Sequence, residues 1–180
     1  MRIIAGELKG RRLQAPTWDG LRPTSDKLRE TLFNVVAPRV PGARVLDLYA
    51  GTGAIGIEAL SRGAAHVTFV EQDPRALTLI EENLRHCGVA DRYAIIRFRL
   101  DGKAPPSLPA GSFDLIVLDP PYDEPDLTVS IAAAEPLLAD EGLLVLEHAR
   151  RTPAPDQVGR LGRTRDLVSG DSALAFYAAT

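Results

Sequence analysis

Cysteine is almost absent from this sequence, since Cys87 is the only one among 180 residues. One cysteine can form neither an internal disulfide bond nor a zinc cluster, which excludes disulfide-rich and zinc-finger proteins. Long hydrophobic runs are also missing: the longest runs of Leu, Ile and Val, such as 115–118 and 143–146, are far shorter than the roughly 18 residues of a membrane span. The first residues lack the apolar core of a secretory signal. We therefore expect a cytoplasmic protein that does not enter a membrane.

Histidine is scarce as well, and none of the three histidines has a second ligand at metal-site spacing. We predict no metal site. What is present is ordinary for a globular protein, with 45% hydrophobic and 25% charged residues. This composition excludes disordered, collagen-like and coiled-coil proteins, and the length is that of one domain.

The charges are distributed unevenly along the chain. Residues 1–44 carry nine Lys or Arg and four Asp or Glu, whereas residues 45–149 carry seven and seventeen. A basic arm on an acidic body suggests that the arm meets a polyanion such as a nucleic acid. An equally simple alternative, which charge alone leaves open, is a solvated charged surface.

The N-terminal part, residues 1–41, is expected to be an extension of the main domain at 42–180, the two forming effectively one compact unit. Residues 2–13 read as two short strands around a glycine turn. Thr24 and Ser25 then offer N-cap hydroxyls to a helix with one apolar face, whose other side carries Lys27 and Arg29.

The main domain alternates between strand and helix. Strands are predicted at 45–49, 66–71, 93–99, 113–119 and 142–148, and helices at 55–62, 74–86 and 127–138. Such alternation predicts a parallel sheet covered on both faces. After it, strands at 163–168 and 173–178 flank a turn at 169–172, which predicts a closing hairpin.

A glycine-rich loop stands at the first junction of strand and helix. Gly51, Gly53 and Gly56 fit the pattern G-x-G-x-x-G, and Glu71 follows the first glycine by 20 residues, where a carboxylate would bind a ribose. Asp47, just before the loop, would repel a pyrophosphate but suits the ammonium and sulfonium of S-adenosylmethionine. The sequence therefore favours S-adenosylmethionine over a dinucleotide.

Asp101, after the third strand, is a candidate for binding the adenine amino group, although it also fits a loop-capping role. The full set of predicted donor-binding residues is Asp47, Tyr49, Ala50, Gly51, Gly53, Glu71, Gln72 and Asp101.

The sequence Asp119-Pro120-Pro121-Tyr122 follows a buried strand, at the carboxyl edge where open α/β sheets bind ligands. Two prolines stiffen the turn, so the Asp119 carboxylate and the Pro120 carbonyl are fixed acceptors for an amino group. Holding its two hydrogens favours a pyramidal nitrogen with a free lone pair. Tyr122 can stack on a base that has left its helix. We predict Asp119, Pro120 and Tyr122 as catalytic residues.

Several strings of residues together resemble the RsmD family of bacterial 16S ribosomal RNA guanine-N2 methyltransferases. They are residues 2–6, 10–13, 22–27 and 29–34, the loop 47–56, the motif 119–122 and Gly170-Asp171-Ser172-Ala173-Leu174. The loop and the Asp-Pro-Pro-Tyr motif are shared by many N-methyltransferases, whereas the N-terminal strings are more specific.

The resemblance implies a class I methyltransferase of the α/β class, Rossmann-like, with a mostly parallel sheet of seven strands, the last antiparallel, and an N-terminal β-hairpin. It also implies transfer of a methyl group from S-adenosylmethionine to N2 of a guanine in 16S rRNA, position 966 in the family. The substrate would be the small ribosomal subunit or its assembly intermediate, and the enzyme a monomer. One departure is the Pro-rich segment after Asp101, where the family has a short helix.

Candidate RNA-binding residues lie in the basic arm and beside it. They are Lys9, Arg11, Arg12, Arg22, Thr24, Lys27 and Arg29. Other functions stay open at this point: methylation of adenine N6 in DNA or of a protein amide by the same fold, a non-catalytic RNA-binding assembly factor, or an NAD-dependent oxidoreductase. Asp47 opposes the last of these.

Overall fold

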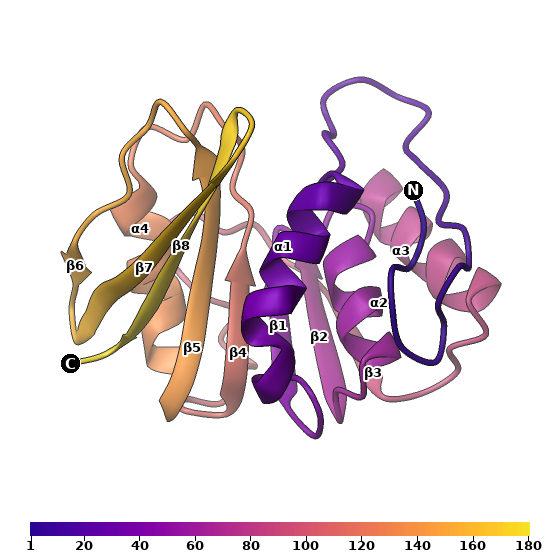
Figure 1. The fold of residues 1–180 in the computed structure, drawn as a ribbon, viewed down its shortest axis with the longest axis horizontal. Coiled ribbons are helices and arrows are strands. Elements are labelled where there is room, and N and C mark those ends of the chain that lie inside the picture. The colour runs from indigo at the N-terminus through magenta and orange to yellow at the C-terminus, as the bar shows by residue number, and fades with distance from the viewer. The chain divides into compact units, whose positions relative to one another are not determined.

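The computed structural model describes residues 1–180, drawn in Figure 1. The chain divides into two compact units, residues 1–99 and 100–180. The boundary predicted between residues 41 and 42 therefore lies inside the first unit. Within the whole chain, no helix combines the length and the hydrophobicity that crossing a membrane requires.

The first unit is built from a parallel three-stranded ladder and three α-helices. Its elements are α1 (Asp26–Val36), the 3-10 helix η1 (Ala37–Arg39), β1 (Arg44–Leu48), α2 (Ala54–Ser61), β2 (His66–Glu71), α3 (Pro74–His86) and β3 (Tyr93–Arg97). The strand order is β3-β2-β1, with both pairs parallel, and Figure 1 shows these strands side by side. The predicted strand and helix positions are confirmed to within a few residues.

Helix α2 is buried on every side, which agrees with its almost wholly apolar sequence. Its Gly56 lies directly against β2: a Cβ atom added there would stand 2.2 Å from Cε1 of Phe69 and 2.9 Å from Cγ1 of Val67. The third glycine of the loop pattern is thus required for close packing of a helix on a strand.

Local capping fixes where two helices begin. The Ser25 hydroxyl accepts a hydrogen bond from the Leu28 N–H at the start of α1. Pro74 occupies the first turn of α3, and the Asp73 carboxylate before it accepts from the Arg75 N–H. Both starts follow from the residue types alone, because these side chains replace missing helical acceptors.

The predicted N-terminal hairpin is reduced to one antiparallel bridge, between Arg2 and Arg12. Ile3 N donates to Arg11 O at 2.9 Å, and Leu13 N donates to Met1 O at 3.0 Å. Two regular strands do not form, because the intervening residues bend toward α2, where Glu7 N donates to Ser61 O.

The second unit joins a parallel pair of strands to an antiparallel ladder. Its elements are β4 (Phe113–Leu118), α4 (Leu127–Ala134), the 3-10 helix η2 (Glu135–Leu137), β5 (Leu138–Ala149), β6 (Gln157–Val158), β7 (Leu161–Ser169) and β8 (Ser172–Ala179). Strand β5 pairs in parallel with β4, and the pairs β5–β8, β8–β7 and β7–β6 are antiparallel. The predicted α/β fold with a parallel part and an antiparallel C-terminal part is confirmed.

Three details differ from the prediction. The structure has an eighth strand, β6, which is only two residues long and follows two prolines. Strand β5 begins at Leu138 and not at 142, and its first part includes the exposed Asp140 and Glu141. The helix expected to reach residue 138 changes to 3-10 geometry at Glu135, just before Pro136. As predicted, the Pro-rich segment after β3 contains no helix.

Candidate active site

The glycine loop connects β1 to α2 through unusual backbone conformations. Gly51 and Gly53 have φ of 57° and 79°, and Tyr49 has φ of 61° without being glycine. A left-handed residue with a side chain costs roughly 1–2 kcal/mol, a strain that is found most often at functional sites. Gly53 is also the N-cap of α2 and offers no side-chain cap. The loop therefore leaves the N-terminus of α2 open to other partners.

Asp47 supplies one of those partners. Its side chain is 1% exposed, and its Oδ2 accepts a hydrogen bond from Gly56 N, in the first turn of α2, at 3.0 Å. Its other oxygen, Oδ1, is buried without any hydrogen-bond partner. Burial raises the pKa of Asp47 to about 8, against the opposing hydrogen bond from Gly56 and with a smaller contribution from the charge of Glu71.

The unpartnered Oδ1 of Asp47 fits the methionine end of S-adenosylmethionine. A buried acceptor without a donor is costly, and the cost disappears when a ligand brings an N–H to it. The ammonium of that donor provides both the N–H and a positive charge, whereas a pyrophosphate provides neither. The residues present therefore suit the methyl donor that the sequence predicted.

Glu71 ties the glycine loop to the turn after β2. Its Oε2 accepts from Gly51 N at 2.9 Å, and its Oε1 accepts from Gln72 N at 2.8 Å and Asp73 N at 3.0 Å. The side chain is half-buried, so lone pairs remain for ribose hydroxyls. The sequence predicted where Glu71 lies but not that its carboxylate also holds the loop in place.

The segment before α1 packs against the same loop. Asn83 of α3 donates to Thr52 O at 3.0 Å and to Gln14 O at 3.2 Å, while its Oδ1 accepts from Gln14 N. A Cβ added at Gly51 would lie 3.2 Å from Cδ1 of Leu21. The chain around Gln14 and Leu21 thus lies beside the predicted donor-binding residues.

The Asp-Pro-Pro-Tyr motif follows β4 in the second unit. Asp119 and Tyr122 are half-buried, and Pro120 is buried. The Tyr122 hydroxyl is hydrogen-bonded to the Ser172 hydroxyl at the start of β8, and it donates to Glu147 Oε1 of β5 at 3.4 Å. Ser172 and Glu147 were missed as site residues, although Ser172 belongs to one of the strings that suggested the family.

Asp101 lies in the exposed loop that begins the second unit. Its assignment to adenine stays a prediction. His148, beside Glu147 on β5, is buried with its Nε2 unpartnered, and its Nδ1 lies 2.7 Å from Thr152 O. The structure holds no cluster of three or more His, Cys, Asp or Glu side chains suited to a metal ion.

The predicted RNA-binding residues divide into an exposed set and one buried exception. Lys9, Arg11, Arg12, Arg22 and Lys27 are exposed, and Thr24 is half-buried. Arg11 also donates to the carbonyl of Cys87 at the end of α3. Arg29 is wrong as an RNA contact, because its side chain is 0% exposed and no part of it can reach a phosphate.

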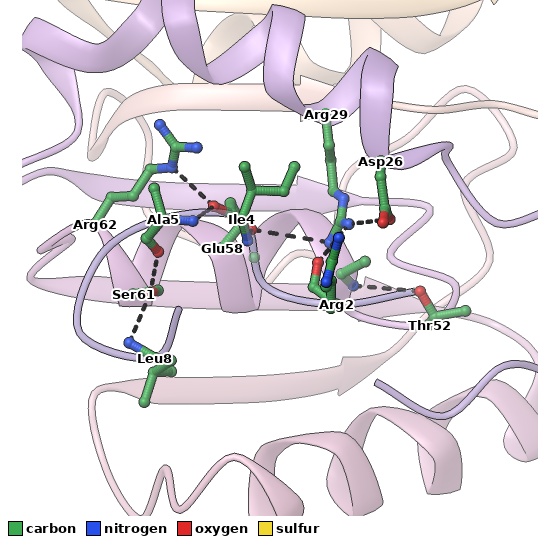
Figure 2. A network of polar contacts seen from close by, with 12 residues as sticks. Arg2, Ile4, Ala5, Leu8, Asp26, Arg29, Thr52, Glu58, Ser61 and Arg62 are labelled. Carbon is green, nitrogen blue, oxygen red and sulfur yellow. Dashed lines mark hydrogen bonds and ion pairs between the residues drawn. The ribbon is translucent and has the colours of Figure 1, made fainter. Parts of the chain in front are cut away.

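Arg29 belongs instead to a buried network around Glu58, shown in Figure 2. Its Nη2 donates to Asp26 Oδ1 at 2.6 Å and to the Arg2 carbonyl at 2.8 Å, and its Nη1 lies 3.9 Å from Glu58 Oε2. Burial lowers the pKa of the Arg29 guanidinium, although Asp26 and Glu58 oppose this shift. The guanidinium acts as a structural link and not as a surface charge.

Glu58 in turn joins the arm to α2. Its carboxylate accepts from Ile4 N at 2.9 Å, Ala5 N at 3.0 Å and Arg62 Nε at 2.9 Å. Ser61, one turn further along α2, bonds to Ala5 O and Leu8 N, as Figure 2 also shows. The arm is therefore held on the helix whose N-terminus carries the glycine loop.

Comparison with known proteins identifies methyltransferases among the relatives of this chain. A family profile described as Conserved hypothetical protein 95 matches residues 1–178. The ribosomal RNA small subunit methyltransferase D of Escherichia coli strain K12 is 34% identical over 179 residues, covering 98% of this chain and 89% of that protein. A Bacillus subtilis strain 168 protein, provisionally named as the rRNA methyltransferase YlbH, is 38% identical over 184 residues, 98% of each protein.

Solved structures show the same similarity in three dimensions. The yhhF protein of Escherichia coli, provisionally named a methyltransferase, superposes with a TM-score of 0.84 at 35% identity, covering 100% of this chain and 99% of that chain. A SAM-dependent methyltransferase from Aquifex aeolicus has a TM-score of 0.62 at 14% identity, over 83% of this chain and 88% of that chain. The second likeness concerns the fold alone.

Proposed function

Because this chain belongs to the family described as Conserved hypothetical protein 95, the RsmD family, we propose that it transfers a methyl group from S-adenosylmethionine to N2 of a guanine in 16S ribosomal RNA. The observation that carries the proposal is the buried, unpartnered Oδ1 of Asp47 beside the glycine loop. This oxygen can accept a hydrogen bond from a cationic amine. S-adenosylmethionine carries such an amine, whereas a dinucleotide carries a pyrophosphate instead.

The residues of the first unit have the donor-binding role. Oδ1 of Asp47 accepts from the ammonium, and the half-buried carboxylate of Glu71 accepts from the ribose hydroxyls. The backbone of Tyr49, Ala50, Gly51 and Gly53 forms the close wall that side chains would block. When bound, S-adenosylmethionine supplies an electrophilic methyl group on a positively charged sulfur.

The residues of the second unit have the amine-binding role. An exocyclic guanine amine is a poor nucleophile because its lone pair is delocalised into the ring. The Asp119 carboxylate and the Pro120 carbonyl accept its two hydrogens and thereby favour a pyramidal nitrogen. The Tyr122 ring stacks on the extruded base, and its hydroxyl is held by Ser172 and Glu147.

Mass mapping of 16S rRNA from cells with and without the gene tests the proposal. We expect one guanine to lose a single methyl group, and the purified protein to restore it on the corresponding small subunits with S-adenosylmethionine. Asp119→Ala is the matched control: it should lose about 10²-fold or more in rate while its affinity for the methyl donor is nearly unchanged. A methyl group missing from adenine N6 in DNA or from a protein amide, with rRNA intact, would instead support the rival methyltransferase function.

A further inference from the structure

A groove of about 640 Å³ lies between the C-terminal half of α3 and the edge strand β3, within the first unit. Glu81 and Arg85 of α3 form one side, Gly88, Val89 and Ala90 form one end, and Tyr93, Ala94 and Ile95 of β3 line the rest. Sites for ligands of nucleotide size occupy roughly 300–1,000 Å³. The groove is therefore large enough for at least one nucleotide, and none of the predicted site residues lies in its lining.

Basic residues gather along the chain that runs from the end of α3 through β3 to the loop after it. Residues 85–103 carry five of the seven basic residues found in 45–149, but only two of the seventeen acidic ones. Arg85 lines the groove, and Arg11 reaches its Gly88 end, where the guanidinium donates to the neighbouring Cys87 carbonyl. Arg11 of the basic arm and Arg85 of the groove thus place positive charge in one region, a pattern that suits a polyanion.

Strand β3 extends this region toward the donor-binding residues. In the parallel ladder Val67 pairs with Tyr93, Phe69 with Ile95 and Glu71 with Arg97, so each pair shares a face of the sheet. Since Gly56 of α2 packs on Val67 and Phe69, this is the face that the helices cover. The exposed Arg97 lies on it about 13 Å along the strand from Tyr93, at the end next to Glu71.

We propose that this groove binds an unpaired stretch of the RNA substrate, as a second contact besides the basic arm. The half-buried Tyr93 stacks on a base, Arg85 and Arg97 contact phosphates, and Glu81, the only acidic residue of the lining, accepts from a base amino group. The proposal rests on the proposed function in its partner, RNA, but it concerns a surface apart from the donor-binding residues.

Binding of a fluorescent 12-residue single-stranded RNA and of transcribed 16S rRNA, measured by anisotropy at several salt concentrations, tests the groove. Arg85→Ala with Arg97→Ala should lower the slope of log affinity against log salt by roughly 1.4, at about 0.7 per phosphate of single-stranded RNA. Tyr93→Leu should lower affinity about tenfold at each salt concentration, whereas Tyr93→Phe should retain it, because stacking needs only the ring. Arg44→Ala, an exposed arginine at the start of β1, is the matched control and should change neither quantity.

Unchanged affinity and slope in the double arginine variant would overturn the proposal, and this variant decides even if Tyr93→Leu does not fold. Normal binding to free RNA with weaker binding to small subunits would also overturn it and indicate a ribosomal protein as the occupant. Methyl transfer at saturating RNA separates the two proposals. The groove variants should keep their turnover rate, while absence of methyl transfer in the unsubstituted protein would contradict the proposed function and leave the groove result standing.

Discussion

At the scale of single residues, the buried carboxyl of Asp47 has two tasks. Its Oδ2 satisfies a helix N–H, and its Oδ1 is left for a ligand. Its pKa of about 8 means that the free protein binds a proton there at neutral pH, which an unfolded aspartate would not. Since the folded state binds more protons between about pH 4 and pH 8, this residue makes stability fall as pH rises through that range.

Asp47 should lose its proton when the methyl donor binds, because the ammonium favours the ionised carboxylate. Calorimetry at pH 7 in two buffers of different ionisation enthalpy should therefore show proton release on binding. Asp47→Asn should weaken donor binding at least tenfold, in line with the loss of one partner of a buried charge pair, and should abolish the release. Identical binding enthalpies of the unsubstituted protein in both buffers would contradict this assignment.

The hydroxyl of Tyr122 orients the side chain, whereas its ring, in the proposed function, stacks on the base. Substitutions can therefore test the two roles separately. Tyr122→Phe should lower the methylation rate about fivefold, the equivalent of one neutral hydrogen bond, and Tyr122→Ala should lower it more because the ring is lost. Ser172→Ala should reproduce the effect of Tyr122→Phe, with KM for the methyl donor unchanged in both.

The double variant with Tyr122→Phe and Ser172→Ala provides the control for a shared interaction. If the two hydroxyls act through one hydrogen bond, the double variant should be no slower than either single variant. Rates that multiply would show that Ser172 does not act through Tyr122.

At the scale of elements, α2 links the arm to the glycine loop. Its N-terminus follows Gly53, its Gly56 packs on β2, and its Glu58 and Ser61 bind the backbone of the arm. The two functions predicted for different parts of the sequence thus share one helix. The position of that helix depends on close contact with Phe69.

Gly56→Ala should therefore destabilise the protein, although alanine is normally the better helix residue. The added Cβ has no room against Phe69, and overpacking of this kind costs about 1–3 kcal/mol. Urea unfolding of the variant measures the loss. In a Phe69→Leu background the same substitution should cost less, and an equal cost in both backgrounds would show that the contact with Phe69 is not the cause.

At the scale of the whole molecule, the net charge of −3 combines a basic N-terminal arm with an acidic body. An acidic body suits a cationic methyl donor, whereas the basic arm suits RNA. Lys9, Arg11 and Arg12 of the arm are exposed, and none of them forms a hydrogen bond with the glycine loop. RNA affinity and donor affinity should therefore vary independently.

Replacement of Lys9, Arg11 and Arg12 by alanine should lower the slope of log RNA affinity against log salt by roughly 2 to 3. Donor affinity, measured by calorimetry, should stay the same. Since Arg11 also bonds to the Cys87 carbonyl, the Lys9→Ala, Arg12→Ala double variant serves as a control and should lower the slope by roughly 1.4 to 1.8. An unchanged slope in the triple variant would mean that the charge of the arm is only solvated surface.

The sequence by itself determined the order of the elements and the places where helices begin. Ser25, Asp73 and Pro74 act on backbone groups within a few residues, and the apolar strands and the glycine loop are local patterns too. Such patterns can be recognised from the sequence because helix capping and hydrophobic periodicity involve only residues that are near one another along the chain. The same reasoning placed Glu71 beside the glycine loop.

Only the tertiary structure decided which side chains are buried and which remote segments supply their partners. Arg29 reads as a solvent-facing charge, but the Arg2 carbonyl and Glu58, 27 and 29 residues away along the chain, lie against it in the interior. Tyr122 is held by Ser172 across 50 residues, and burial raises the pKa of Asp47 to about 8. Burial and the partners of a side chain depend on the packing of segments that are remote in sequence, so no local pattern of residues specifies them.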